Sequence, residues 1–68
     1  MRSTAQVVEE LLAAGFRLRR SYLLHLVYER IVPRPMKGPA GEYLWLPSEI
    51  ERVREVLVAR GRGPRRSR

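Results

Sequence analysis

The hydrophobic residues of this chain of 68 residues recur at helical spacing in three separate stretches. In the first stretch, Val8, Leu11 and Leu12 follow a Ser-Thr-Ala-Gln sequence, which is typical of the capping box that begins a helix. Gly15 comes after this stretch, and glycine commonly ends a helix. The pattern therefore predicts a first helix over about residues 4–14.

The second stretch places Leu23, Leu26 and Val27 on one face of a helix over about residues 20–30. Phe16 and Leu18 lie in the short connection before it, where we expect them to fill the core between the first two helices. Such a pair of helices joined by a short turn is compatible with helix-turn-helix geometry.

The third stretch predicts a helix over about residues 48–59. Pro47 suits its first turn, and Gly61 suits its end. Its apolar stripe consists of Ile50, Val53, Val56 and Leu57.

Alternating and turn-forming residues fill the gap between the second and third helices. Prolines at positions 33 and 35 prevent helix continuation and favour extended backbone, and a Gly-Pro-Ala-Gly sequence at 38–41 favours a turn. The aromatic sequence Tyr-Leu-Trp-Leu that follows has high strand propensity. We expect a β-hairpin with arms at about 31–36 and 42–46, and we expect Trp45 to lie in the core.

The order helix, turn, helix, hairpin, helix predicts a mainly α fold with a small β-hairpin, which is a winged helix-turn-helix. Residues 1–60 form one domain in this interpretation, and residues 61–68 form a disordered basic tail, because that segment has nothing to bury.

Charge and composition narrow the function. The chain has 14 Lys and Arg against 7 Glu, and it has one His, no Asp and no Cys. This set offers no nucleophile–base pair and no metal-ligand cluster, so we expect neither an enzyme, nor a cofactor, nor a metal site. The basic excess favours a polyanionic partner, usually nucleic acid. No apolar run reaches the ~18 residues of a membrane span, so we expect an intracellular protein without membrane contact.

The ordered series of elements resembles the small winged-helix domain of MerR-type regulators and of phage or plasmid excisionases. The resemblance covers about residues 3–58. Its parts are a Ser/Thr-led first helix, the sequence Tyr-Leu-Leu-His-Leu-Val-Tyr-Glu-Arg-Ile-Val-Pro at 22–33, the glycine-containing hairpin that reaches Tyr43, and the Leu-Pro-Ser-Glu-Ile-Glu-Arg-Val sequence at 46–53.

Three departures from this family bear on the expectations. Arg30 stands where the family often has glycine, and it therefore requires either an unusual backbone or a shifted helix end. The turn before the second helix, 16–20, is longer than usual. No long dimerisation helix follows the third helix, so the resemblance points to the excisionase-like or stand-alone members.

The resemblance implies that the second helix enters the major groove of DNA and that the hairpin wing contacts the backbone or the minor groove. The face of this helix opposite its core residues offers Arg20, Ser21, Leu24, His25 and Tyr28. An arginine at the helix start can bind guanine in a bidentate manner, and Ser and Tyr suit phosphates. Leu24 has three open readings: a thymine methyl, the wing, or a protein partner.

Further basic residues extend this candidate site at both sides of the helix and beyond the third helix. Arg17 and Arg19 precede the second helix, and Arg34 and Lys37 belong to the hairpin. Phosphate contacts are also expected of the tail arginines Arg62, Arg65, Arg66 and Arg68.

We therefore expect a sequence-specific double-stranded DNA-binding protein, either an excisionase-type architectural factor or a compact transcriptional regulator. It would act in the cytoplasm at the nucleoid, with further contacts to itself, to a recombinase or to a polymerase. Two alternatives stay open, namely an RNA- or ribosome-binding basic protein and a winged-helix module that binds proteins.

Overall fold

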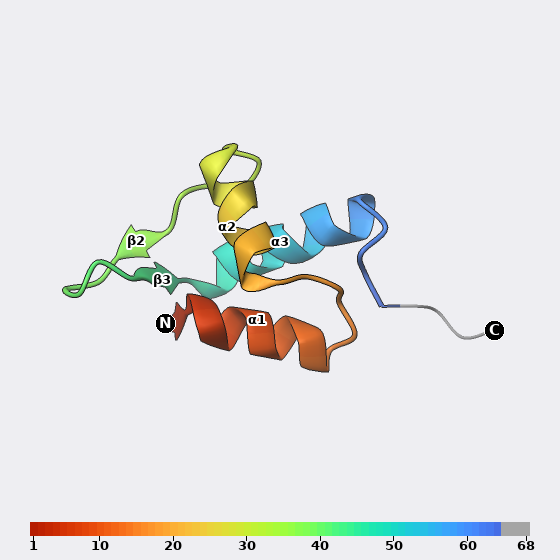
Figure 1. Cartoon of the computed structure of the whole chain (residues 1–68), viewed down its shortest axis with the longest axis horizontal. Helices are drawn as coiled ribbons and strands as arrows, with labels where there is room; N and C mark the ends of the chain where they lie inside the picture. The colour runs from red at the N-terminus through yellow and green to blue at the C-terminus, as the bar shows by residue number, and fades with distance from the viewer. Residues whose placement is uncertain (65–68) are drawn as a thin grey trace.

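The computed structural model describes residues 1–64, which form three helices and one three-stranded antiparallel sheet (Figure 1). The helices are α1 (Thr4–Ala13), α2 (Arg20–Tyr28) and α3 (Pro47–Ala59). About half of the chain is helical, and the helices combine with a small antiparallel sheet, so the predicted set of three helices and a hairpin is confirmed in part, as a small fold of helices and strands. None of these described helices has the length and apolar character needed to cross a membrane.

The sheet contains the expected hairpin and one strand that we did not predict. Strand β2 (Met36–Lys37) pairs with β3 (Tyr43–Trp45), and β1 (Arg2–Ser3) pairs with the other edge of β3, which gives the order β1-β3-β2. The connection between β2 and β3 is five residues long, as expected, and Gly41 adopts a φ of 82° within it. The N-terminus is thereby tied to the middle of the sheet.

The first arm of the hairpin is much shorter than the predicted span 31–36. Only Met36 and Lys37 pair with β3, because Pro33 and Pro35 have no N–H group to donate to a strand ladder. Val32 instead turns into the core, where it is 2% exposed.

The core lies where the three helices meet β3. Trp45 is completely buried, and its indole Nε1–H donates a hydrogen bond to Thr4 Oγ1 over 3.1 Å. The predicted stripe of α2, the burial of Phe16 and Leu18, and three of the four residues of the α3 stripe are confirmed, whereas Val56 is only partly buried at the margin of the core. The buried hydrophobic residues are Val7, Leu11, Phe16, Leu18, Leu23, Leu26, Val27, Val32, Trp45, Ile50, Val53 and Leu57.

The predicted apolar face of α1 needs a correction. Leu12 is 51% exposed, whereas Val7, which we did not place in the stripe, is fully buried. The buried positions are Thr4, Val7 and Leu11, which follow one another at intervals of three and four residues and so share one face. Val8 is only partly buried, at the margin of the core.

All three helices end in the same way. A residue with positive φ follows each helix, and the next N–H group bonds back to a carbonyl of the last turn, as in a Schellman motif. These bonds run from Phe16 to Leu11, from Ile31 to Leu26 and from Arg62 to Leu57. The positive-φ residue is glycine after α1 and α3 but Arg30 after α2, with a φ of 58°. Arg30 thus has an unusual backbone, and α2 ends two residues before the predicted boundary.

The packed part of the chain continues past the boundary that we expected at residue 60. The backbone N–H of Arg17 donates to the carbonyl of Arg62 over 2.8 Å, and the Arg62 side chain returns a bond to the Arg17 carbonyl over 3.2 Å. Gly61 and Arg62 therefore belong to the domain, because their hydrogen bonds join the end of α3 to the turn between α1 and α2. The tail residues Arg65, Arg66 and Arg68 lie outside the described residues.

Candidate nucleic-acid interface

Four of the five residues of the predicted face of α2 are exposed, and the fifth, Leu24, is half-buried. Arg20, Ser21, His25 and Tyr28 are exposed, and Tyr28 is 85% exposed. The spacing places Ser21, His25 and Tyr28 opposite Leu23, Leu26 and Val27, which hold the helix on the core, whereas Arg20 lies on the side of Leu23 and Val27 and is exposed in the first turn of the helix. The helix therefore presents a polar and aromatic surface with Arg20 in its first turn.

A shallow hollow of about 280 Å³ joins this face of α2 to the hairpin. Arg20 and Leu24 line it from α2, and Gly41, Glu42 and Tyr43 line it from the hairpin. Leu24 is half-buried there, so its side chain lies toward the hairpin. Leu24 and the hairpin line the same hollow, and the three readings of Leu24 stay predictions. The hairpin and α2 thus form one continuous surface.

The two basic residues of the hairpin region lie at different places. Lys37 pairs with Tyr43 across the hairpin, and its ammonium group lies 5.7 Å from the centre of the Tyr43 ring. Arg34 is exposed beyond Pro33 and lines a hollow of about 380 Å³ that also includes Arg30. Both side chains are accessible, Lys37 on the hairpin and Arg34 near the C-terminal end of α2.

Arg19 and Arg17 lie before α2 in unlike surroundings. Arg19 occupies the N-cap position and is exposed, without a side-chain cap bond. Arg17 donates from its guanidinium group to the Gly61 carbonyl and is tied by its backbone to Arg62. Arg19 therefore adjoins Arg20 at the start of α2, whereas Arg17 and Arg62 connect the turn to the end of α3.

Ion pairing separates this surface from the rest of the domain. The three ion pairs among residues 1–64 are Arg2–Glu10, Arg52–Glu55 and Arg54–Glu51, and they all lie on β1, α1 and α3. Residues 16–46 contain six Lys and Arg against two Glu, whereas residues 1–15 and 47–60 together contain four against five. Within residues 1–60, most of the positive charge that no ion pair neutralises therefore lies in the segment 16–46, which contains α2 and the hairpin.

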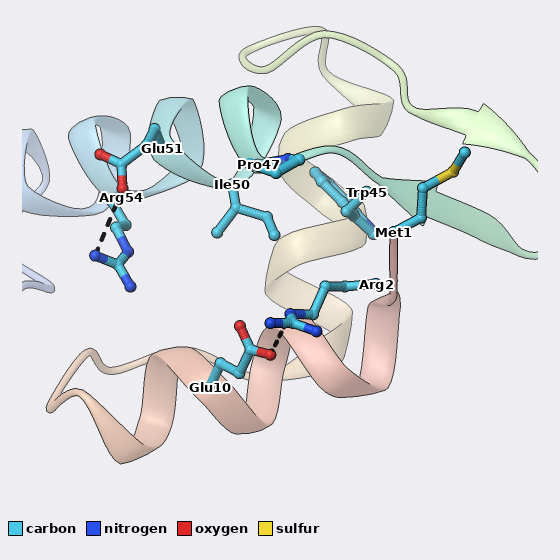
Figure 2. Close-up of a pocket in the computed structure, with 8 residues that line it drawn as sticks. All are labelled: Met1, Arg2, Glu10, Trp45, Pro47, Ile50, Glu51 and Arg54. Atoms are coloured by element: carbon cyan, nitrogen blue, oxygen red, sulfur yellow. Dashed lines mark ion pairs between the residues drawn. The ribbon is translucent and has the colours of Figure 1, made fainter.

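A hollow of about 350 Å³ between the start of α3 and α1 illustrates the neutralised side (Figure 2). Trp45, Pro47 and Ile50 form its apolar part. Two of the ion pairs, Arg2–Glu10 and Arg54–Glu51, stand at its margins. This surface has balanced charge, so it attracts a polyanion less than the α2 surface does.

The sequence did not single out two residues that lie next to the exposed surface of α2, namely Tyr22 and Arg60. Tyr22 contacts the C-terminal arginines through its ring and its hydroxyl group. From its position next to the core face of α2, Tyr22 would be expected to pack at the edge of the core. Arg60 is 38 residues away in the sequence, so no local sequence pattern links the two residues.

Among the described residues, no three His or Glu side chains come together as they would around a metal ion. No protein-family model, curated protein or solved structure matches the chain. The resemblance to MerR-type regulators and excisionases therefore stays a prediction.

Proposed function

We propose that this chain is a sequence-specific double-stranded DNA-binding protein of the winged-helix type. The observation that carries the proposal is the exposed, unneutralised basic surface of α2 and the hairpin, set against ion-paired α1 and α3. A single α-helix, ~10–12 Å across with its side chains, matches the ~12 Å width of the B-DNA major groove.

In this arrangement α2 reads bases and the hairpin holds the backbone. Arg19 and Arg20 at the start of α2 supply bidentate donors for guanine, and His25 lies one turn after Ser21 on the exposed side of the helix. Ser21 and Tyr28 donate to phosphates. Lys37 and Arg34 contact the backbone or the adjacent minor groove.

The geometry favours DNA over a regular RNA duplex. The major groove of A-form RNA is deep and narrow, so a helix with an exposed face cannot lie in it. The element order and the positive φ of Arg30 also agree with the winged-helix family that the sequence resembles, in which glycine is frequent at that position. Both proposed roles, excision factor and compact regulator, use this same mode of binding.

The test compares two triple variants with equal changes of charge. In the first, Arg19, Arg20 and Lys37 are replaced by Gln. In the second, Arg2, Arg52 and Arg54, the three ion-paired arginines, are replaced by Gln. The affinity for a duplex is measured against salt concentration, and each phosphate contact contributes about 0.9 to the slope of log K against log salt.

We expect the first variant to bind the duplex more weakly. The slope of log K against log salt should become smaller in magnitude by up to about 2.7, since three contacts at about 0.9 each are removed. The second variant should keep a slope close to that of the unmodified protein. Equal losses in both variants, or tighter binding to a structured RNA than to duplex DNA at the same salt, would overturn the proposal.

Selection of bound duplexes from a random pool, followed by footprinting, then separates the two roles. Spaced direct repeats indicate an excisionase-type architectural factor, and a palindrome indicates a dimeric regulator. A pool without any enriched sequence contradicts sequence-specific recognition.

A further inference from the structure

Two arginines contact Tyr22 on the side of the domain where α3 ends, and a third, Arg17, is hydrogen-bonded to the same segment. The Arg62 guanidinium group lies 4.0 Å from the centre of the Tyr22 ring, which is a cation–π contact. Arg60 Nη1 is 3.5 Å from the Tyr22 hydroxyl oxygen, to which it donates. Arg17 meets both Gly61 and Arg62 through hydrogen bonds. Tyr22 is therefore the centre of a cluster formed by two distant parts of the chain.

Backbone hydrogen bonds fix this cluster, so it does not depend on side-chain contacts alone. The Arg62 N–H donates to the Leu57 carbonyl over 2.8 Å, which turns the chain back at the end of α3. The Arg62 carbonyl then accepts from the Arg17 N–H over 2.8 Å. These two bonds hold Arg17 and Arg62 next to each other, and Arg60 lies beside them as the C-cap residue of α3.

The charge of the cluster is not balanced by an ion pair among residues 1–64. None of the three ion pairs within residues 1–64 involves Arg17, Arg60 or Arg62. Like charges held close together repel one another, and an anion between them replaces this repulsion by attraction. Guanidinium groups bind phosphate with paired, charge-assisted hydrogen bonds, so phosphate is the anion that this chemistry fits.

The cluster and the hairpin flank α2 on opposite sides. Successive residues of an α-helix are rotated by about 100° from one another, which puts Tyr22 about 160° from Arg20 and Leu24 on average. Arg20 and Leu24 line the hollow toward the hairpin, whereas Tyr22 lies beside His25, with ring centres 6.3 Å apart. In Figure 1 the hairpin and the end of the described chain likewise lie at opposite ends of the molecule.

We propose that Arg17, Arg60 and Arg62 form a second phosphate-binding site, which holds a DNA backbone on the side of α2 opposite the hairpin. Tyr22 is its positioning residue, since its ring and hydroxyl group hold Arg62 and Arg60 in place. The inference rests on the proposed DNA-binding function. In this arrangement α2 lies between two contacts with the DNA backbone, one made by the hairpin and one made by this cluster.

The test uses the full chain with Arg60→Gln, Arg62→Gln and, as matched control, Arg52→Gln. Arg52 lies on α3, the helix that ends at the cluster. It is exposed and pairs with Glu55. We expect each cluster variant to reduce the salt slope of duplex binding by about 0.9 and the control to leave it unchanged. Circular dichroism melting confirms that each variant is folded at the temperature of the measurement.

A fourth variant, Tyr22→Leu, changes no charge. We expect it to weaken duplex binding several-fold at low salt, because the arginines lose their common support, while Tyr22→Phe, which keeps the ring, retains more of the affinity. A Tyr22→Leu protein that is folded and binds as tightly as the unmodified chain would overturn the positioning role.

The outcomes separate this inference from the function on which it rests. If the variant of Arg19, Arg20 and Lys37 loses binding but Arg60→Gln and Arg62→Gln behave like Arg52→Gln, the second site is wrong and the proposed function stands. If the unmodified chain does not bind duplex DNA, both fail. Binding to phosphatidylglycerol vesicles is measured in parallel. If Arg60→Gln loses vesicle binding but keeps duplex binding, the DNA site is also wrong.

Discussion

Arg30 bears a backbone strain that the two equivalent positions avoid. Its φ of 58° lies in the same left-handed region as the φ angles of 74° at Gly61 and 94° at Gly15. All three residues follow a helix in the same motif. A side chain in this left-handed region costs about 1 kcal/mol relative to glycine. The strained residue lies where α2 turns toward the hairpin, so the domain keeps this turn at a cost in stability.

At this residue we predict that Arg30→Gly stabilises the domain by about 1 kcal/mol, because glycine adopts positive φ without a Cβ clash. Urea denaturation followed by circular dichroism measures the free energy of unfolding. Arg30→Ala is the control, since it removes the same charge and keeps the clash. If Ala and Gly stabilise equally, the gain comes from the lost charge and not from the backbone.

Among the elements, the segment Gly61–Arg62 stabilises the turn between α1 and α2 although it belongs to neither helix. Its backbone and side-chain bonds to Leu57 and Arg17 contribute about 1 kcal/mol each, and the stacking of Arg62 on Tyr22 adds about 0.5–1 kcal/mol. Because these groups are partly exposed, the net contribution is about 2 kcal/mol.

We therefore predict that a chain ending at Arg60 melts about 10 °C lower than the full chain, since about 1 kcal/mol corresponds to 4–8 °C in a domain of this size. A chain ending at Pro64 is the control and should melt close to the full chain, because it keeps every contact of Arg62. Thermal melting by circular dichroism makes the comparison. Equal melting temperatures for the two truncations would show that Arg62 adds nothing to the fold.

The short strand β1 shows where local sequence patterns stop being informative. The helices follow from apolar periodicity, and the hairpin follows from its prolines, glycines and aromatic residues. A strand of two residues has no periodicity, and Arg2 and Ser3 carry no strand preference that distinguishes them from a loop. Their pairing with Trp45 and Leu44 depends on contacts between distant parts of the chain.

The sequence likewise predicted one part of the candidate site, the face of α2, but not the cluster around Tyr22. The exposed face of α2 followed from the position of Leu23, Leu26 and Val27, because the opposite side of an amphipathic helix faces solvent. The cluster around Tyr22 did not follow, since it unites residues about 40 positions apart through tertiary contacts.

For the domain as a whole, the proposed function would couple its stability to a bound duplex. A domain of this size buries only ~60% of the surface of its unfolded chain, so its intrinsic stability is small. A duplex that binds only the folded state adds about 2.7 kcal/mol when its concentration is a hundred times the dissociation constant.

We predict that such an excess of a selected duplex raises the melting temperature by about 10 °C or more. Differential scanning calorimetry with increasing duplex concentration measures the shift. The variant in which Arg19, Arg20 and Lys37 are Gln should show a much smaller shift at the same concentrations. A melting temperature that is insensitive to any duplex would contradict specific binding to the folded state.

The hydrogen bond from Trp45 to Thr4 gives the domain a built-in spectroscopic probe. Trp45 is the single tryptophan of the chain, it is fully buried, and its partner is 41 residues away in sequence. Its fluorescence emission therefore has a blue-shifted maximum only while the N-terminal strand, α1 and β3 are joined, and it shifts to the red when they separate. Since Trp45 lies in the core and not on the exposed face of α2, this emission follows folding even when the domain is bound to a partner.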